Sequence, residues 1–262
     1  MSDRRCGGVD LKGKRALVTG ATAGIGAAIA QSLCAAGCDV VITGRRRDRL
    51  EAQAKDWSDR YHVQVTTAAF DLSDQATVEQ VFAARPDLAD VDILVNNAGL
   101  ARGTDKMHEA DPTDWAEMID TNVGGLLWMT RPIAAKMAAR GDGHIVNLGS
   151  VAGRWTYPGG GVYCATKAAV GALSEGLRMD LHGTGVRVTN IEPGLVETEF
   201  SEVRFRGDTA RAKSVYAGTR ALDAADVAET VLWCLARPAH VNVQELVLFP
   251  TDQASVRDVH RR

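Results

Sequence analysis

The chain has 262 residues, 45% of them hydrophobic, which is enough for one substantial core and a length that allows one or two domains. Its 30 Lys and Arg against 33 Asp and Glu leave a formal net charge of −3, which argues against a polyanion such as nucleic acid as the partner. The five cysteines form no CxxC pair, the six histidines show no metal-ligand spacing, and no secretory leader or run of about 18 apolar residues occurs. We therefore expect a reduced, cytoplasmic protein without a metal site, a disulfide framework or a membrane span.

Short apolar runs rich in β-branched residues alternate with longer stretches of helical periodicity. In chain order the predicted strands are Ala16–Thr19, Val40–Thr43, Gln64–Phe70, Ile93–Val95, Ile145–Leu148, Arg187–Ile191 and Glu245–Phe249. The clearest predicted helices are Gly26–Ala36, Arg46–Ser58, Asp114–Met137 and Val162–Leu181. Apolar strands that are each followed by a helix predict an α/β fold with one doubly wound (Rossmann) parallel sheet, covered by helices on both faces.

The pattern also predicts how the chain is divided. No linker with a shift in composition interrupts it, so residues 1–262 are predicted to form a single domain, with residues 1–12 as a flexible N-terminal extension. Residues 201–219 are charged and lack an apolar pattern. We expect them to form a mobile loop and a short helix over a site.

The segment TGATAGIG, residues 19–26, leads directly from the first predicted strand into the first helix. Its first glycine allows a tight turn, its second lets the backbone approach a pyrophosphate, and its third lets helix and sheet pack closely. The N-terminus of the helix also offers aligned N–H donors to negative charge. A βα turn without a ligand is the alternative, which the position after the first strand disfavours. The residues predicted to contact a dinucleotide are Gly20, Thr22, Ala23, Gly24, Ile25 and Gly26.

The second predicted strand ends in TGRRR, residues 43–47, where a dinucleotide-binding fold commonly has an acidic side chain for the ribose 2′-hydroxyl. Cations without a carboxylate favour a 2′-phosphate, so the sequence predicts NADP(H) with Arg45 and Arg46 as ligands. The alternative is a solvated helix start, balanced by the nearby Asp48 and Glu51. Asp71 and Leu72 close the third strand, where they could meet the adenine, and a capping role for Asp71 would be compatible with this.

Tyr163 and Lys167 are four residues apart on a predicted helix and therefore share one face. An ammonium beside a phenol stabilises the phenolate, so we expect the pKa of Tyr163 to move from near 10 toward neutrality. Ser150 follows the strand Ile145–Leu148, which carries it to the carboxyl edge of the sheet. Taken singly, the Tyr and Lys could be a surface pair and the Ser could be a cap.

Together these features resemble the short-chain dehydrogenase/reductase family, from about Lys14 to the C-terminus. The matching motifs are TGATAGIG, DILVNNAG (92–99), Asn122 in DTNVGG, Ser150 with YCATK (163–167), and EPGLVET (192–198). The resemblance implies that Tyr163 is the acid/base, that Ser150 polarises the substrate carbonyl or alcohol, and that Lys167 binds the nicotinamide ribose and lowers the Tyr163 pKa. It also implies that Asn122 holds a water in a proton relay and that the protein is a homotetramer. The further residues implied to line the cofactor are Asn97, Gly99, Pro193, Gly194, Val196 and Thr198.

Within this family the chain is similar to the NADP-dependent 3-hydroxy acid dehydrogenases, through GRRRDRL (44–50), WAEMIDTN (115–122) and most of residues 179–253. That resemblance implies serine, L-allo-threonine or 3-hydroxypropionate as the substrate class. It departs at Gly161, where the subgroup usually has Asn, and at Val196-Glu197, where it often has Gly-Gly. Both positions adjoin the substrate, so the resemblance implies the reaction type more strongly than the substrate. Two alternatives stay open: a broad aldehyde or ketone reductase, and an inactive NADP-binding sensor.

A 3-hydroxy acid held at Tyr163 and Ser150 leaves its carboxylate two bonds away, in a crevice where an unpaired anion is costly. We expect a cation there. Arg204 and Arg206, in the segment 201–219, are the candidates. The alternative is that both are solvated charges or subunit contacts.

Overall fold

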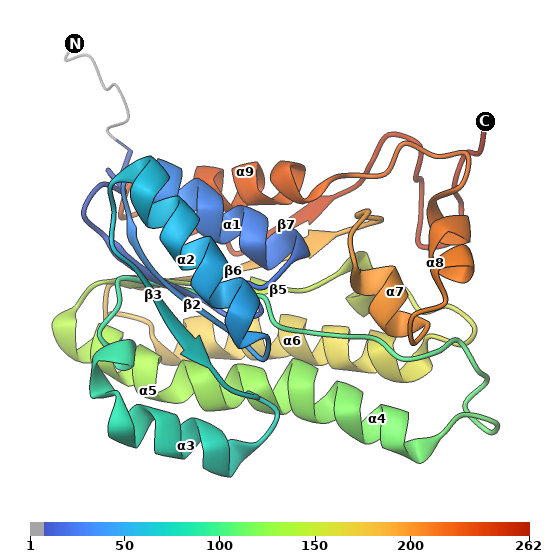
Figure 1. The fold of residues 1–262 in the computed structure, drawn as a ribbon, viewed down its shortest axis with the longest axis horizontal. Helices are drawn as coiled ribbons and strands as arrows, with labels where there is room; N and C mark the ends of the chain where they lie inside the picture. Colours follow the sequence, from blue (N-terminus) through green and yellow to red (C-terminus); the bar gives the residue numbers. More distant parts are fainter. Residues whose placement is uncertain (1–7) are drawn as a thin grey trace.

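The computed structural model describes residues 8–262, which form a seven-stranded sheet with helices on both faces (Figure 1). The strand order is β3-β2-β1-β4-β5-β6-β7, and every neighbouring pair is parallel. The strands are β1 (Arg15–Val18), β2 (Asp39–Gly44), β3 (Val65–Ala69), β4 (Ile93–Asn96), β5 (Gly143–Leu148), β6 (Val186–Pro193) and β7 (Glu245–Leu248). The predicted fold class and all seven predicted strands are confirmed. Because the order reverses between β1 and β4, a crevice is expected at their carboxyl ends.

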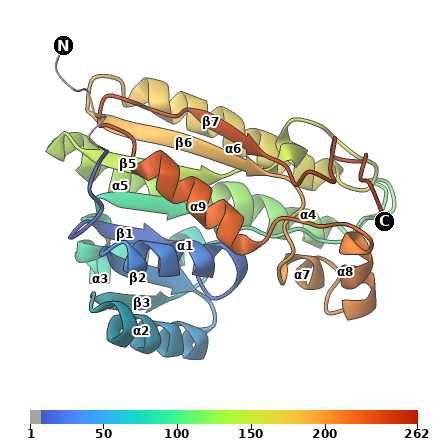
Figure 2. The same cartoon turned by 90° about the horizontal axis from the view of Figure 1, so that it is seen from above.

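The helices form two layers, with α1, α2 and α9 on one face of the sheet and α3, α5 and α6 on the other (Figures 1 and 2). The helices are α1 (Gly24–Ala35), α2 (Arg47–Tyr61), α3 (Gln75–Ala84), α4 (Pro112–Ile119), α5 (Gly125–Arg140), α6 (Gly161–Asp180), α7 (Phe200–Arg204), α8 (Thr209–Tyr216) and α9 (Ala224–Leu235). Three short turns complete the set: η1 (Pro86–Ala89), η2 (Asp120–Gly124) and η3 (Val151–Gly153). None of these helices has the length and apolar character to cross a membrane.

Successive side chains along a strand point alternately into two separate hydrophobic cores, one on each face of the sheet. In β1, Ala16 and Val18 pack into the core shared with α1 and α9, whereas Leu17 packs into the core on the opposite face. A strand that is apolar on both sides is what a sheet covered on both faces requires. The sheet is therefore held from both sides, and its carboxyl edge is a rigid platform for a site.

The predicted helix over Asp114–Met137 is confirmed as a helical segment, but it is not α-helical throughout. The chain there is helical, but α4 and α5 are separated by the π-helical turn η2. The glycine after this turn allows a close approach of Leu72, since a Cβ on Gly125 would lie 1.8 Å from Leu72 Cδ1 and 3.0 Å from Leu72 O. The turn presents Asn122 to the loop after β4, and such π turns are frequent at functional sites.

The predicted loop over residues 201–219 has more structure than expected. It contains most of α7 and the whole of α8. Asp208 caps α8 by accepting from the backbone N–H of Arg211 at 2.9 Å. The Tyr216 hydroxyl, at the other end of α8, shares a 2.7 Å hydrogen bond with Ser201 Oγ and donates to the backbone oxygen of Val196. These contacts pack the two helices together at the carboxyl edge of the sheet.

The predicted N-terminal extension lies only partly within the described residues. Residues 1–7 are outside them. Further along, Val9 donates its backbone N–H to Ala236 O at 3.1 Å, and Leu11 is buried.

Candidate active site

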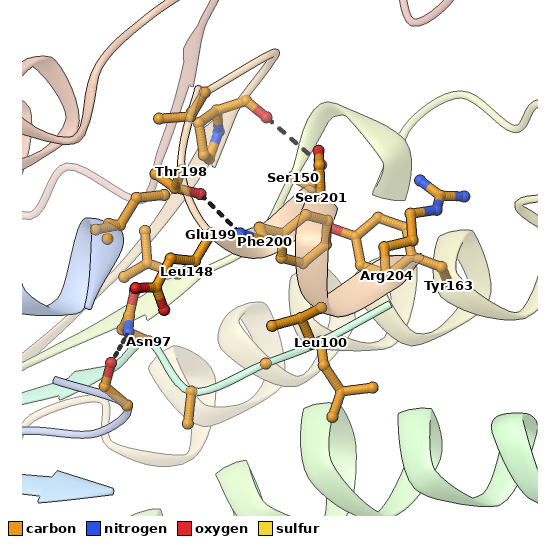
Figure 3. Close-up of a pocket in the computed structure, with 18 of the residues that line it drawn as sticks. Asn97, Leu100, Leu148, Ser150, Tyr163, Thr198, Glu199, Phe200, Ser201 and Arg204 are labelled. Atoms are coloured by element: carbon orange, nitrogen blue, oxygen red, sulfur yellow. Dashed lines mark hydrogen bonds between the residues drawn. The ribbon is translucent and has the colours of Figure 1, made fainter. Parts of the chain in front are cut away.

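A cavity of about 540 Å³ opens at the carboxyl edge of the sheet, between the ends of β1, β4, β5 and β6 and the helix α7 (Figure 3). It gathers nearly all of the predicted site residues. Those that line it are Gly20, Thr22, Ala23, Gly24, Ile25, Arg45, Arg46, Asp71, Leu72, Asn97, Gly99, Ser150, Tyr163, Lys167, Pro193, Gly194, Val196, Thr198 and Arg204. Three others, Gly26, Asn122 and Arg206, do not line it.

The glycine-rich turn has the backbone shape that a pyrophosphate needs. Gly20 and Gly24 have φ angles of +65° and +55°, in the left-handed region that favours glycine. Ala23, at the N-cap of α1, makes no side-chain capping bond, and the first turn of the helix has no acidic residue. The first N–H groups of α1 are thus left to an anion, and the turn fits a dinucleotide.

Gly26 serves packing rather than ligand contact. A Cβ there would lie 2.3 Å from Asn97 Nδ2 and 2.5 Å from Gly20 O. Asn97 occupies that space because its Nδ2 donates to Thr19 O at 2.9 Å and to Gly20 O at 3.2 Å, which ties the end of β4 to the glycine-rich turn (Figure 3). Asn97 therefore holds the turn in shape and also lines the cavity.

The arginines predicted to bind a 2′-phosphate stand at one end of the cavity, each beside a carboxylate. Arg45 Nη1 lies 3.6 Å from Asp71 Oδ2. Arg46 donates from Nε and Nη2 to Thr22 Oγ1, at 3.1 and 2.7 Å, and from Nη1 to Glu199 Oε2 at 2.9 Å. Glu199 was not foreseen, because its partner is 153 positions away in the chain.

Asp71 combines the two uses considered for it. Its Oδ1 accepts from Ser73 N at 3.0 Å and from Ser73 Oγ at 2.8 Å, which closes the turn after β3. It also lines the cavity together with Leu72. Asp71 therefore closes the turn and lines the cavity, and the contact of Asp71 and Leu72 with an adenine stays a prediction.

The catalytic candidates meet between β5 and α6. Ser150 accepts from Ala152 N at 3.1 Å, which caps η3, and its Oγ donates to Pro193 O at 3.4 Å (Figure 3). Lys167 is buried, and its Nζ donates to Leu148 O at 2.7 Å. Burial lowers the pKa of Lys167 to about 8.

The expected lowering of the Tyr163 pKa by Lys167 is not seen in this structure. Burial raises the pKa of the Tyr163 phenol, and the nearby Tyr157 adds to the rise. A hydrogen bond with Ser150 opposes it. The physical reason is that Lys167 points to a backbone carbonyl and the phenolate is desolvated, so the cost of burying its charge prevails.

Asn122 supports the site from behind the cavity lining. Its Oδ1 accepts from Leu100 N at 2.8 Å, and its Nδ2 donates to Leu100 O at 2.9 Å and to Thr166 Oγ1 at 3.0 Å. Gly99 makes this possible, since a Cβ there would lie 3.2 Å from Asn122 Oδ1 and 3.5 Å from Lys167 Nζ. Asn122 thus anchors the loop after β4 beside Lys167, and its water-holding role stays a prediction.

The two arginines proposed for a substrate carboxylate behave differently. Arg204 lies in the cavity with its guanidinium 5.5 Å from the ring centre of Tyr157 and 5.9 Å from that of Tyr163. Arg206 instead forms an ion pair with Asp114, is mostly exposed, and lies outside the cavity lining. Only Arg204 is therefore placed to meet a substrate, and the candidacy of Arg206 is corrected.

Several lining residues were not predicted, chiefly Tyr157, Phe200 and Val203. Tyr157 begins the turn YPGG just before α6, and an aromatic residue six positions ahead of Tyr163 was an available signal. Phe200 packs its ring 5.7 Å from that of Tyr163. Within residues 8–262 no group of three His, Cys, Asp or Glu side chains could hold a metal ion.

The family model described as short chain dehydrogenase matches residues 14–208. The chain belongs to this family. The predicted family membership is thus confirmed.

This short-chain dehydrogenase has well-covered relatives. It is 48% identical over 249 residues to NADP-dependent 3-hydroxy acid dehydrogenase YdfG from Escherichia coli, covering 94% of this chain and 99% of that protein. It is 46% identical over 240 residues to sulfoacetaldehyde reductase 2 from Chromohalobacter salexigens, covering 91% and 94%. The closed form of serine dehydrogenase complexed with NADP⁺ superposes with a TM-score of 0.87 at 47% identity, covering 95% of this chain and all 100% of that one.

Proposed function

We propose that this short-chain dehydrogenase is an NADP(H)-dependent oxidoreductase that interconverts a 3-hydroxy acid and its carbonyl counterpart, in the serine, L-allo-threonine or 3-hydroxypropionate class. The observation that carries the proposal is the state of Arg204. Among the described residues no carboxylate lies within 4.0 Å of it, whereas the neighbouring Arg102 and Arg206 are paired with Glu117 and Asp114. A half-buried cation without a counter-ion, beside a catalytic phenol, is a site for an anionic substrate.

Tyr157 completes this anion site. Arg204 donates from Nη1 to the Tyr157 hydroxyl at 3.0 Å, so the phenol proton of Tyr157 is free to point elsewhere. A second bond from Arg204, Nε to Gly103 O at 2.9 Å, fixes the guanidinium. The remaining N–H groups of Arg204 and the Tyr157 hydroxyl together offer donors to a carboxylate. The relatives support this choice, since the names of two of them specify hydroxy acids or serine.

The cofactor would be held by Arg45, Arg46 and the glycine-rich turn, and when bound it supplies the hydride acceptor or donor. The chain's own residues handle the proton and the orientation. In the reducing direction the Tyr163 phenol donates its proton to the substrate oxygen while Ser150 Oγ donates a hydrogen bond to the same atom. In the oxidising direction Tyr163 takes the hydroxyl proton. The raised pKa of Tyr163 keeps the proton-donating form abundant at neutral pH.

A substrate panel tests the proposal. Serine, L-allo-threonine and 3-hydroxypropionate are compared with the matching amides and simple alcohols, following the absorbance of the reduced nicotinamide with NADP⁺ and with NAD⁺. The acids are expected to show a kcat/KM at least about tenfold above that of the amides and simple alcohols, because only the acids have a carboxylate that can pair with Arg204. Equal rates would favour the broad aldehyde or ketone reductase. Cofactor binding without any turnover would favour the inactive sensor, which the set Asn122, Ser150, Tyr163 and Lys167 argues against.

We further propose that residues 1–262 form one NADP-binding domain that works as a homotetramer in the cytoplasm, with a small molecule as its substrate. Large apolar side chains on the outer faces of α5, α6 and α9 support association: Leu127, Met179 and Trp233 are exposed. Molar mass by light scattering on a gel-filtration column tests the assembly, and a monomer at micromolar concentration would contradict it.

A further inference from the structure

Glu199 connects the two ends of the cavity. It stands between Thr198, which lines the cofactor side, and the helix α7, which carries Arg204. In Figure 3 Glu199 and Arg204 lie on opposite sides of Phe200. The Glu199 carboxylate accepts from Arg46 Nη1 at 2.9 Å and from Arg49 Nη1 at 2.8 Å. One anion therefore bridges two cations at the start of α2.

Each of the three guanidinium nitrogens of Arg46 makes one of these contacts, which use three of its five N–H bonds. One edge, Nε and Nη2, faces Thr22 Oγ1, and Nη1 on the other edge binds Glu199. A phosphate binds arginine through two parallel N–H bonds from one edge. A phosphate bound to the edge formed by Nη1 and Nη2 of Arg46 therefore competes with the Glu199 carboxylate for Nη1.

We propose that Glu199 competes with the cofactor's 2′-phosphate for Arg46. The bound phosphate displaces Glu199 from Arg46 and thereby loosens the start of α7. The proposal rests on the proposed use of NADP(H). After displacement Arg49 still pairs with Glu199, so the start of α7 loses one of its two ion pairs with the start of α2 and keeps the other. The far end of α7 stays fixed, since Arg102 donates to Val203 O at 2.5 Å and Gly103 N donates to Arg204 O at 3.0 Å. Binding at one end of the cavity is thus linked to the freedom of the helix that carries the substrate's cation.

A merely orienting role for Glu199 is the competing explanation. Thr22 alone already fixes two of the three nitrogens of Arg46, so the guanidinium needs no carboxylate to hold its direction. The pairs with Glu199 are half exposed. An exposed ion pair of this kind contributes at most about one kcal/mol, so its removal should raise the phosphate affinity by roughly two- to fivefold.

The test uses fragments that reach only the adenosine end: adenosine 2′,5′-bisphosphate, and 5′-AMP, which lacks the 2′-phosphate. Calorimetric titration compares the wild type with Glu199→Gln. The matched control is Glu202→Gln, an exposed carboxylate on α7 for which the described residues offer no ion pair. We expect Glu199→Gln to bind the bisphosphate roughly two- to fivefold more tightly and 5′-AMP equally, with the gain shrinking at high salt. Glu202→Gln should match the wild type. Unchanged or weaker bisphosphate binding by Glu199→Gln would overturn the proposal.

Hydrogen exchange gives a second readout. In the wild type the bisphosphate, unlike 5′-AMP, should speed exchange of the amides of residues 200–204, whereas in Glu199→Gln these amides should exchange fast without it. Unchanged or slowed exchange in the wild type would overturn the link to α7. A wild type that bound 5′-AMP as tightly as the bisphosphate would refute the proposed cofactor, and this inference with it. A wild type that prefers the bisphosphate without a gain in Glu199→Gln would refute this inference alone.

Discussion

Arg204 donates to the hydroxyl of Tyr157 at 3.0 Å, and the two residues are 47 positions apart in the chain. This bond joins α7 to the turn before α6 and sets the cation over the face of Tyr163. The position of Arg204 relative to Tyr163 thereby sets how far the charged group of a substrate can lie from its reacting group. Substrate choice should therefore depend on this one side chain.

Arg204→Met should raise the KM for a hydroxy acid by about tenfold or more and leave an uncharged ketone nearly unaffected, because only the acid loses its ion pair. Steady-state kinetics on both substrates measure this. Arg206→Met is the matched control, since Arg206 is paired with Asp114 outside the cavity. Equal losses on charged and neutral substrates would show that Arg204 is structural and would favour the broad reductase.

Tyr163→Phe removes the proton donor and keeps the ring that packs against Phe200. Turnover should fall by about 10²–10⁴, as general acid/base catalysis is lost, while cofactor affinity barely changes. Single-turnover rates and a cofactor titration separate the two effects. A variant that keeps more than about half of its activity would contradict the assignment of Tyr163.

The pH dependence follows from the same group. Burial raises the pKa of Tyr163, so at neutral pH the phenol is mostly protonated. Oxidation needs the phenolate, so its kcat should climb steadily from neutral toward alkaline pH, whereas reduction should hold at neutral pH and fall on the alkaline side. Profiles in both directions check this. An oxidation rate that levels off below neutrality would mean that the phenol pKa is lowered in the working enzyme.

Cofactor preference should depend more on Arg46 than on Arg45. Arg46 is anchored by Thr22 at the glycine-rich turn, whereas Arg45 is more exposed and only 3.6 Å from Asp71. The wild type should bind NADP(H) at least about tenfold more tightly than NAD(H), through charge-assisted bonds of roughly 1.5–3 kcal/mol each. Arg46→Met should lose most of that preference and Arg45→Met a smaller part. Titrations that give equal affinities for both cofactors in the wild type would refute the NADP proposal.

The parts of the fold that could be predicted are those encoded locally. Strand alternation, the glycine-rich turn and the spacing of Tyr163 and Lys167 depend on neighbouring residues, and the structure places all of them as expected. Pairings across long stretches of chain could not be predicted, such as Glu199 with Arg46, because they depend on how separate elements pack. The contact between Gly125 and Leu72 could not be predicted for the same reason.

The pKa of Tyr163 could not be predicted from the sequence either. Spacing alone puts Lys167 next to Tyr163 and suggests a lowered phenol pKa. Burial of both groups, which only the packed structure reveals, acts in the opposite sense and prevails in this structure.

His144 makes the fold sensitive to acid. It lies buried in β5, where its Nε2 shares a 2.8 Å hydrogen bond with Thr189 Oγ1 and its Nδ1 has no partner among the described residues. Burial lowers the pKa of His144 to about 3, with the charge of Arg187 adding to the shift. In the unfolded chain the ring takes up its proton below its ordinary pKa of 6.5, whereas in the folded protein it stays neutral until about 3. Stability contributed by the neutral ring is thus complete above pH 6.5 and is lost as the pH falls below it, by up to about 2 kcal/mol at roughly pH 5.

Urea unfolding at several pH values measures this loss. His144→Gln keeps a polar group near Thr189 but cannot be protonated, so its free energy of unfolding should change less between about pH 7 and 5 than that of the wild type. His108→Gln is the matched control, because it makes the same change at an exposed histidine. Parallel curves for the wild type and His144→Gln would show that other groups cause the acid sensitivity. A flatter curve for His144→Gln alone would assign the acid sensitivity to this buried ring. The slope of the unfolding free energy against pH reports the number of protons taken up on unfolding, and His144 takes up one.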